Sequence, residues 1–152
     1  MPSSRRWPAA DVTYLTDSPL DLNLLIARVH GADRGGIASF LGVVRSHHQG
    51  RSVVRLSYSA YPEMAEAECA RIVAEAETRW PVHVAVEHRI GTLEIGEAAV
   101  AVVAAGAHRE EAFAACRHVI EELKRRVPIW KREQFADGGA DWVGADAGPE
   151  AQ

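Results

Sequence analysis

Two lysines are the first residues whose type and spacing could carry chemistry. The 152-residue chain holds 17 lysine and arginine side chains, of which 15 are arginines and two, Lys124 and Lys131, are lysines seven positions apart. A guanidinium stays charged in proteins, whereas an ammonium is compact and its pKa shifts readily on burial. The two positions therefore indicate either a reaction that needs an amine or two ordinary surface lysines.

The sequence around the two lysines predicts where each of them lies on a helix or strand. Residues from about Arg109 to Arg126 predict a helix, and at roughly 100° per residue Lys124 lies within about 50° of the centre of its apolar stripe. The stripe consists of Phe113, Cys116, Ile120, Leu123 and Val127. Partial burial would lower the pKa of Lys124, but a lysine at this border can also extend its ammonium into water or offset the helix dipole. Pro128 would turn the next strand so that Lys131 points back toward Lys124, unless Lys131 is an ordinary strand lysine.

Other basic residues predict an anion site. His108 and Arg109 open the predicted helix, where free backbone N–H groups favour anions, although His108 could simply cap the helix. Arg45 ends an apolar strand and could bind a phosphate with two hydrogen bonds. Residues 34–62 and 124–132 hold several cations and no acid, in a chain of net charge −4. This pattern indicates either a confined anion site or two solvated basic faces.

Composition and missing signals exclude several classes of protein. The net charge of −4 argues against a general nucleic-acid-binding protein. No apolar run approaches about 18 residues and the first residues lack the apolar core of a signal peptide, so neither a membrane span nor secretion is expected. Cys69 and Cys116 have no metal-ligand spacing, which fits the reducing cytoplasm. The adjacent His47 and His48 lack a carboxylate or cysteine at ligand spacing, so no metal site is expected.

Periodicity and breaker residues predict an α+β fold. The predicted helices cover 18–30, capped by Ser18 before Pro19, then 62–80 and 109–126. The apolar stripe of the second helix is Met64, Cys69, Ile72, Val73 and Ala76. The predicted strands cover 12–15, 37–44, 52–58, 82–90, 98–107, 129–135 and 141–143. We expect 37–44 and 52–58 to pair as a hairpin across the loop 46–50, 98–107 to be a central strand and 91–97 to be a turn. Residues 1–10 and 144–152 are predicted to be disordered tails.

Several segments, in order, resemble the large, catalytic subunits of molybdopterin synthases. The matching segments are Phe40–Arg45 with His47, Tyr61–Met64, His88–Gly91, Ala107–Arg109 and Leu123–Glu133. The last of these, LKRRVPIWKRE, is the most specific. The resemblance runs from about residue 11 to Val143, so it assigns residues 11–143 to the catalytic-subunit domain. It also implies an α/β-hammerhead fold with an additional antiparallel β subdomain.

The resemblance also implies a function and partners. It implies a sulfurtransferase that needs no cofactor or metal and forms a homodimer within a heterotetramer. A small ubiquitin-like sulfur-carrier subunit would sit at each end of that dimer. The carrier's C-terminal Gly-Gly thiocarboxylate would enter a pocket of the large subunit. Sulfur would pass in two rounds to cyclic pyranopterin monophosphate, forming the dithiolene of molybdopterin.

The family's functional residues transfer by position. Its two essential lysines correspond to Lys124 and Lys131. Its anion-pocket residues correspond to Arg45, His108 and Arg109, with Phe40 and Arg132 nearby. The hypothesis is that Lys124 acts at the reacting centre and that Lys131 holds substrate or the thiocarboxylate.

Two other functions fit the same residues. A non-catalytic module that binds a phosphorylated small molecule through Arg45, His108 and Arg109 would tolerate arginine in place of both lysines. A scaffold that only docks a ubiquitin-like partner would need neither His108 nor Arg45. The chain departs from the family at its end, because residues 144–148 (GADAG) carry no cation, so a contribution of this tail to a neighbouring subunit's pocket is left open.

Overall fold

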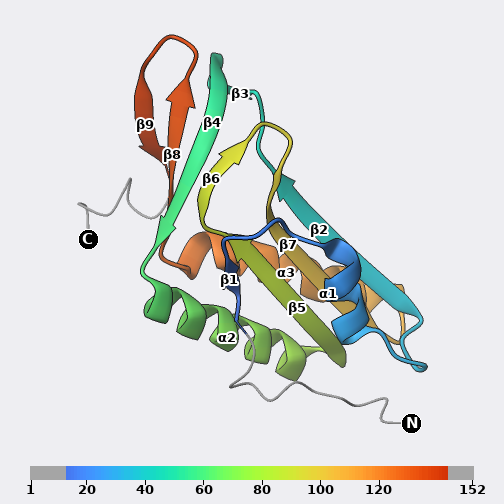
Figure 1. Ribbon diagram of the computed structural model, residues 1–152. Helices are drawn as coiled ribbons and strands as arrows, with labels where there is room; N and C mark the ends of the chain where they lie inside the picture. Colours follow the sequence, from blue (N-terminus) through green and yellow to red (C-terminus); the bar gives the residue numbers. More distant parts are fainter. Residues whose placement is uncertain (1–12, 144–152) are drawn as a thin grey trace.

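A four-stranded sheet forms the centre of the molecule (Figure 1). The structure is a computed structural model that describes residues 13–143. The strand order is β1-β5-β7-β2. These strands are β1 (Leu15–Thr16), β5 (Val82–Arg89), β7 (Ala98–Gly106) and β2 (Gly36–Val43). β7 pairs antiparallel with β5 and β2, whereas β1 runs parallel to β5.

Helices cover both faces of this sheet (Figure 1). α2 (Pro62–Arg79) and α3 (Arg109–Arg126) pack on one face, and α1 (Leu22–Val29) packs on the other. Alternate residues of β7 face the two layers: Val100 and Val102 join the α2–α3 core, and Ala101 and Val103 join the α1 core. A continuous run of small apolar residues suits a strand that is buried on both faces. The prediction of a central strand at 98–107 is therefore confirmed.

A second, antiparallel sheet stands beside the first (Figure 1). Its five strands are β3 (His47–His48), β4 (Arg51–Ala60), β6 (Gly91–Glu94), β8 (Ile129–Phe135) and β9 (Ala140–Val143). β4 pairs with β3, β6 and β8, and β8 also pairs with β9. A small core joins the two sheets, in which Leu56 and Leu93 pack with Ala99 of β7. The predicted α+β fold with an additional antiparallel β subdomain is confirmed.

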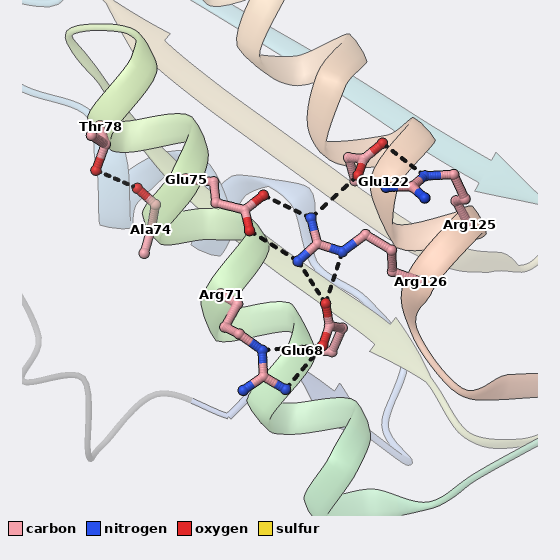
Figure 2. Close-up of polar contacts among 8 residues, drawn as sticks. All are labelled: Glu68, Arg71, Ala74, Glu75, Thr78, Glu122, Arg125 and Arg126. Atoms are coloured by element: carbon pink, nitrogen blue, oxygen red, sulfur yellow. Dashed lines mark hydrogen bonds and ion pairs between the residues drawn. The ribbon is translucent and has the colours of Figure 1, made fainter.

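Ion pairs join the middle of α2 to the C-terminal turn of α3 (Figure 2). The guanidinium of Arg126 lies 2.6 Å from Glu68 and 2.7 Å from Glu75, both on α2, and 3.2 Å from Glu122 on its own helix. Arg126 is one-fifth exposed, so water screens these contacts only in part. The cluster fixes the C-terminal turn of α3 on α2, and Lys124 belongs to that turn.

The predicted pairing of 37–44 with 52–58 is wrong. β2 pairs with β7, and β4 pairs with β8 and β6. The hairpin in this region is instead β3–β4, with His47 opposite Ser52 and His48 opposite Arg51. Its two turn residues, Gln49 (φ 51°) and Gly50 (φ 79°), are both left-handed, as a tight two-residue hairpin turn requires.

Other local predictions also need correction. The first helix is capped by Asp21 rather than Ser18, because the Asp21 carboxylate accepts hydrogen bonds from the Asn23 and Leu24 amides. Residues 91–94 form β6 rather than a turn, since Leu93 is fully buried between the sheets. Met64 and Phe113 are 60% and 65% exposed and belong to neither apolar stripe. The strand expected at 12–15 is β1 at Leu15–Thr16, and the predicted tails lie outside the described residues.

Candidate active site

A cavity of about 560 Å³ opens where the two sheets meet the C-terminal end of α3. Its walls come from six strands (β2, β3, β4, β5, β7 and β8), from the segment that follows β2, and from α2 and α3. The cavity has the size of a small-molecule site, which in proteins is typically about 300–1,000 Å³. Much of its inner wall is apolar, with Leu56, Val100 and Ile120 among the lining residues.

Three cations from three separate elements line this cavity. Lys124 comes from the last turn of α3, Lys131 from β8 and Arg45 from the segment after β2. Burial lowers the pKa of Lys131, and the charges of Lys124 and Arg45 lower it further, while Glu133 opposes the shift. Lys124 and Arg45 are therefore close enough to Lys131 for their charges to affect its protonation.

The cavity also holds one deeply buried carboxylate. Glu133 of β8 is 2% exposed, and its Oε1 lies 2.7 Å from His48 Nδ1 and 3.9 Å from Lys131 Nζ. Lys131 and Glu133 share a face of β8 because side chains alternate along a strand. Sequence reasoning did not select Glu133, although its position two residues after a predicted site lysine is a signal that could have found it.

A neutral pair forms another part of the wall. His88 Nδ1 lies 2.7 Å from the Arg89 carbonyl oxygen; because a carbonyl only accepts, Nδ1 carries the proton and donates. Burial lowers the pKa of His88 to about 4, and the nearby Lys124 contributes. Its ring meets the Tyr58 ring edge-on at 5.0 Å, and burial, with Glu133, raises the pKa of Tyr58 to about 12. Both side chains are therefore neutral near pH 7, and neither was among the predicted site residues.

The structure brings together four of the seven predicted site residues. Lys124, Lys131, Arg45 and Phe40 all line the cavity. Lys124 is exposed while its neighbour Leu123 is buried, so it stands at the border of the buried face as the helical count predicts.

The other three predicted residues do not line the cavity. Arg132 is exposed on the opposite face of β8 from Lys131. His108 is the N-cap of α3, and Arg109 is the first residue of that helix. Lys124 lies 15 residues further along α3, which at 1.5 Å per residue is about 22 Å. Within one chain, His108 and Arg109 therefore lie far from the part of the cavity that Lys124 lines.

The described residues contain neither a metal-binding cluster nor a membrane-spanning helix. Among residues 13–143, no group of three or more His, Cys, Asp and Glu side chains is placed to hold a metal ion. No helix in that range is long and apolar enough to cross a membrane. Cys69 lines the cavity, but burial raises the pKa of its thiol to about 12, so it is a poor nucleophile near pH 7.

Known proteins with similar sequences and folds share one description. The family model described as "MoaE protein" matches residues 15–126. A molybdopterin synthase catalytic subunit from Mycobacterium tuberculosis is 49% identical over 131 residues, which covers 86% of this chain and 88% of that protein. The crystal structure of molybdopterin synthase from Staphylococcus aureus superimposes with a TM-score of 0.83 at 33% identity, covering 88% of this chain and 97% of that one.

A more distant solved structure shows the same fold. It is a complex of subunits 1 and 2 of the molybdopterin-converting factor from Helicobacter pylori, and the matched chain has a TM-score of 0.67 at 21% identity over 88% of this chain and 89% of that one. The family match, supported by the identity to the curated relative, shows that this chain belongs to the MoaE protein family, the sulfur-transferring catalytic subunits of molybdopterin synthase that act in molybdenum cofactor biosynthesis.

Proposed function

We propose that this chain transfers sulfur from the C-terminal thiocarboxylate of a small ubiquitin-like carrier subunit to cyclic pyranopterin monophosphate. The observation that carries the proposal is the convergence of Lys124, Lys131 and Arg45 on one cavity from three separate elements. Both reactants are anions, so a locally cationic cavity in a chain of net charge −4 would attract them to this place rather than to the whole surface.

The chemistry of the lining residues supports this reaction. An arginine binds a phosphate with two parallel hydrogen bonds, which suits Arg45 to the cyclic phosphate. An ammonium can neutralise the thiocarboxylate, whose sulfur bonds to the pterin precursor. It can also stabilise the oxyanion that forms when water adds to the acyl carbon, before the carbon–sulfur bond breaks and the carrier leaves as its carboxylate, and it can supply a proton. We assign the reacting centre to Lys124 and the holding of substrate or thiocarboxylate to Lys131. Phe40 contributes an apolar surface at the cavity wall.

The direct test is reconstitution of the reaction. The purified chain is mixed with a thiocarboxylated carrier subunit and the pterin precursor, and molybdopterin is measured. Product is expected only when all three components are present. If the mixture binds its ligands but forms no product, the chain is a binding module and the proposed function is wrong.

We further propose that the active form is a homodimer in which a second copy supplies His108 and Arg109. β2 lies at the end of the strand order β1-β5-β7-β2, and among the described residues it pairs only with β7. It exposes Ile37, Leu41 and Val43, at 42%, 41% and 52%. An unpaired apolar edge strand in a soluble protein is normally covered by a partner.

Complementation tests this shared site. Lys124→Arg and Arg109→Ala proteins are each expected to be inactive. When they are mixed and allowed to exchange subunits, some dimers combine an intact Lys124 with an intact Arg109, so activity should return to about a quarter of wild type or more. Mass measurement by light scattering shows whether dimers form. Dimers that exchange without regaining activity would exclude the shared site.

A further inference from the structure

The buried carboxylate of Glu133 is the feature of the cavity that its proposed function does not use. It is 2% exposed, and among the described residues its side chain makes ion-pair contacts with His48 and Lys131 but no hydrogen bond of good geometry. A buried carboxylate without hydrogen bonds is costly, and a neutral side chain of the same size would avoid that cost. Its presence therefore calls for a role in the cavity.

The nearest partners of Glu133 are His48 and Lys131. His48 Nδ1 lies 2.7 Å from Oε1, and Lys131 Nζ lies 3.9 Å from the same oxygen. His48 belongs to the short strand β3, which pairs with β4, so the hairpin turn at Gln49 and Gly50 holds its ring against β8. One carboxylate oxygen thus faces both an imidazole and an ammonium.

The charges that face Lys131 come from every element around it. Lys124 of α3 and Arg45 after β2 are cations that oppose its ammonium form, and Glu133 of its own strand favours that form. His48 of β3 lies beyond the carboxylate, and the neutral Tyr58 of β4 and His88 of β5 complete the wall. Glu133 is the only carboxylate among the described residues that line the cavity.

We propose that Glu133, held by His48, is a positioning residue that fixes the ammonium of Lys131 at the cavity wall and sets the pH at which it loses its proton. Without this carboxylate, burial and two neighbouring cations would drive Lys131 toward the neutral amine. With it, Lys131 stays charged enough to hold an anion but loses its proton more readily than an exposed lysine. Glu133 touches no ligand in this scheme and acts only through Lys131.

The small number of lysines makes the proposal directly measurable. A chain labelled with 13C at lysine Cε gives side-chain signals from only Lys124 and Lys131, which Lys124→Arg and Lys131→Arg variants assign. In wild type, the Lys131 signal should titrate below the usual pKa of a lysine. In Glu133→Gln, its pKa should fall by a further unit or more, because an opposite charge within about 4–6 Å shifts a pKa by roughly one to three units.

A second variant tests the part of His48. His48→Phe keeps a ring but removes the nitrogen that lies 2.7 Å from Glu133 Oε1, so the carboxylate loses the contact that holds it near Lys131. The pKa of Lys131 should then fall, in the same direction as in Glu133→Gln but by less. The matched control is Glu94→Gln, which removes an exposed carboxylate on β6 that does not line the cavity and should leave both lysine signals in place. An unchanged Lys131 titration in both Glu133→Gln and His48→Phe would overturn the proposal.

An activity measurement extends the test but rests on the proposed function. The basic limb of the pH–activity profile should move to lower pH in Glu133→Gln, by the same amount as the NMR titration, and Glu133→Asp should recover part of the shift. A merely structural role would lower activity at all pH values without moving the limb. The NMR experiment needs neither carrier nor precursor, so a shifted lysine signal in a protein that makes no molybdopterin would reject the proposed function and leave the positioning role standing.

Discussion

Arg126 and Lys131, five residues apart, stand in opposite electrostatic settings. Three glutamates surround Arg126, at 2.6, 2.7 and 3.2 Å (Figure 2), and they raise its pKa. Lys131 has one carboxylate at 3.9 Å, which also contacts His48, and its pKa is lowered by burial and, further, by two neighbouring cations. The positive charge of Arg126 is neutralised by its glutamates, whereas the positive charge of Lys131 is only partly balanced and can still attract an anion. An arginine therefore holds the two helices together, whereas both lysines face the cavity, where Arg45 accompanies them.

The largest effect should come from exchanging the type of cation in the cavity. Lys124→Arg keeps the charge but replaces the compact ammonium, and we expect molybdopterin formation to fall by about 100-fold or more, the cost of losing one transition-state donor. The matched control is Arg125→Lys, at the neighbouring exposed position, which should change the rate less than twofold. A Lys124→Arg enzyme with wild-type kcat would show that a guanidinium serves as well as an ammonium at this position, and would contradict the role proposed for Lys124.

Removing Arg126 from the ion-pair cluster between α2 and α3 should lower the stability of the fold without changing the activity of the folded protein. Arg126→Ala removes the arginine that links Glu75, Glu68 and Glu122, while Glu68 keeps Arg71 and Glu122 keeps Arg125. We expect the Tm to fall by about 3–6 °C, as loss of charge-assisted hydrogen bonds would cause in a domain of this size. Activity per folded molecule should stay within about twofold. Arg117→Ala, which removes an 81% exposed partner of Glu121, serves as the control and should hardly move the Tm.

Acid should weaken the same cluster over a defined range of pH. Hydrogen bonds from arginines lower the pKa of Glu68 and Glu75, and that of Glu122 to about 2. Groups with a lowered pKa stabilise the fold above their usual value, near 4.5, and lose that contribution as pH falls through the lowered values. The difference in unfolding free energy between wild type and Arg126→Ala should therefore shrink between pH 5 and 2. A difference that stays constant in urea titrations across this range would contradict the cluster's role.

The smallest effect concerns the neutral wall of the cavity. The pKa of His88, lowered to about 4 by burial, means that the unfolded chain binds this proton more readily than the folded chain does. Stability from this group is therefore full above about 6.5 and declines as pH falls toward 4. In histidine NMR, the His88 ring should remain neutral at pH 5.5. A His88 ring that is protonated at pH 5.5 would show that water reaches this part of the cavity wall.

Local sequence signals predicted the parts of the fold that depend on local interactions. The helices at 62–79 and 109–126 follow from apolar periodicity, a proline at the start of the first and prolines just after each end. The buried strand at 98–106 follows from its run of small apolar residues. The identity of β2's partner could not be read in this way, because the apolar run at 36–43 is equally compatible with pairing to β4 or to β7.

The site residues likewise fall into those that the sequence could select and those that only the tertiary structure shows. The two lysines and Arg45 were selected from residue type and from the family resemblance, and the structure brings them to one cavity. Glu133 was missed because a glutamate in an alternating strand normally faces water, and only the tertiary structure, which brings β4 and His48 of β3 beside it, buries it. His108 and Arg109 were grouped with Lys124 although the length of α3 separates them.

The sequence by itself determined which residues can do chemistry here and which helices and strands carry them. Arginine occupies 15 of the 17 lysine and arginine positions, and lysine remains at two. Only the tertiary structure decided which of these residues meet, which carboxylate accompanies them and which predicted partners stand about 22 Å away along a helix. The physical reason is that residue type and periodicity are local properties, whereas burial, charge proximity and the resulting pKa depend on contacts between segments far apart in the chain.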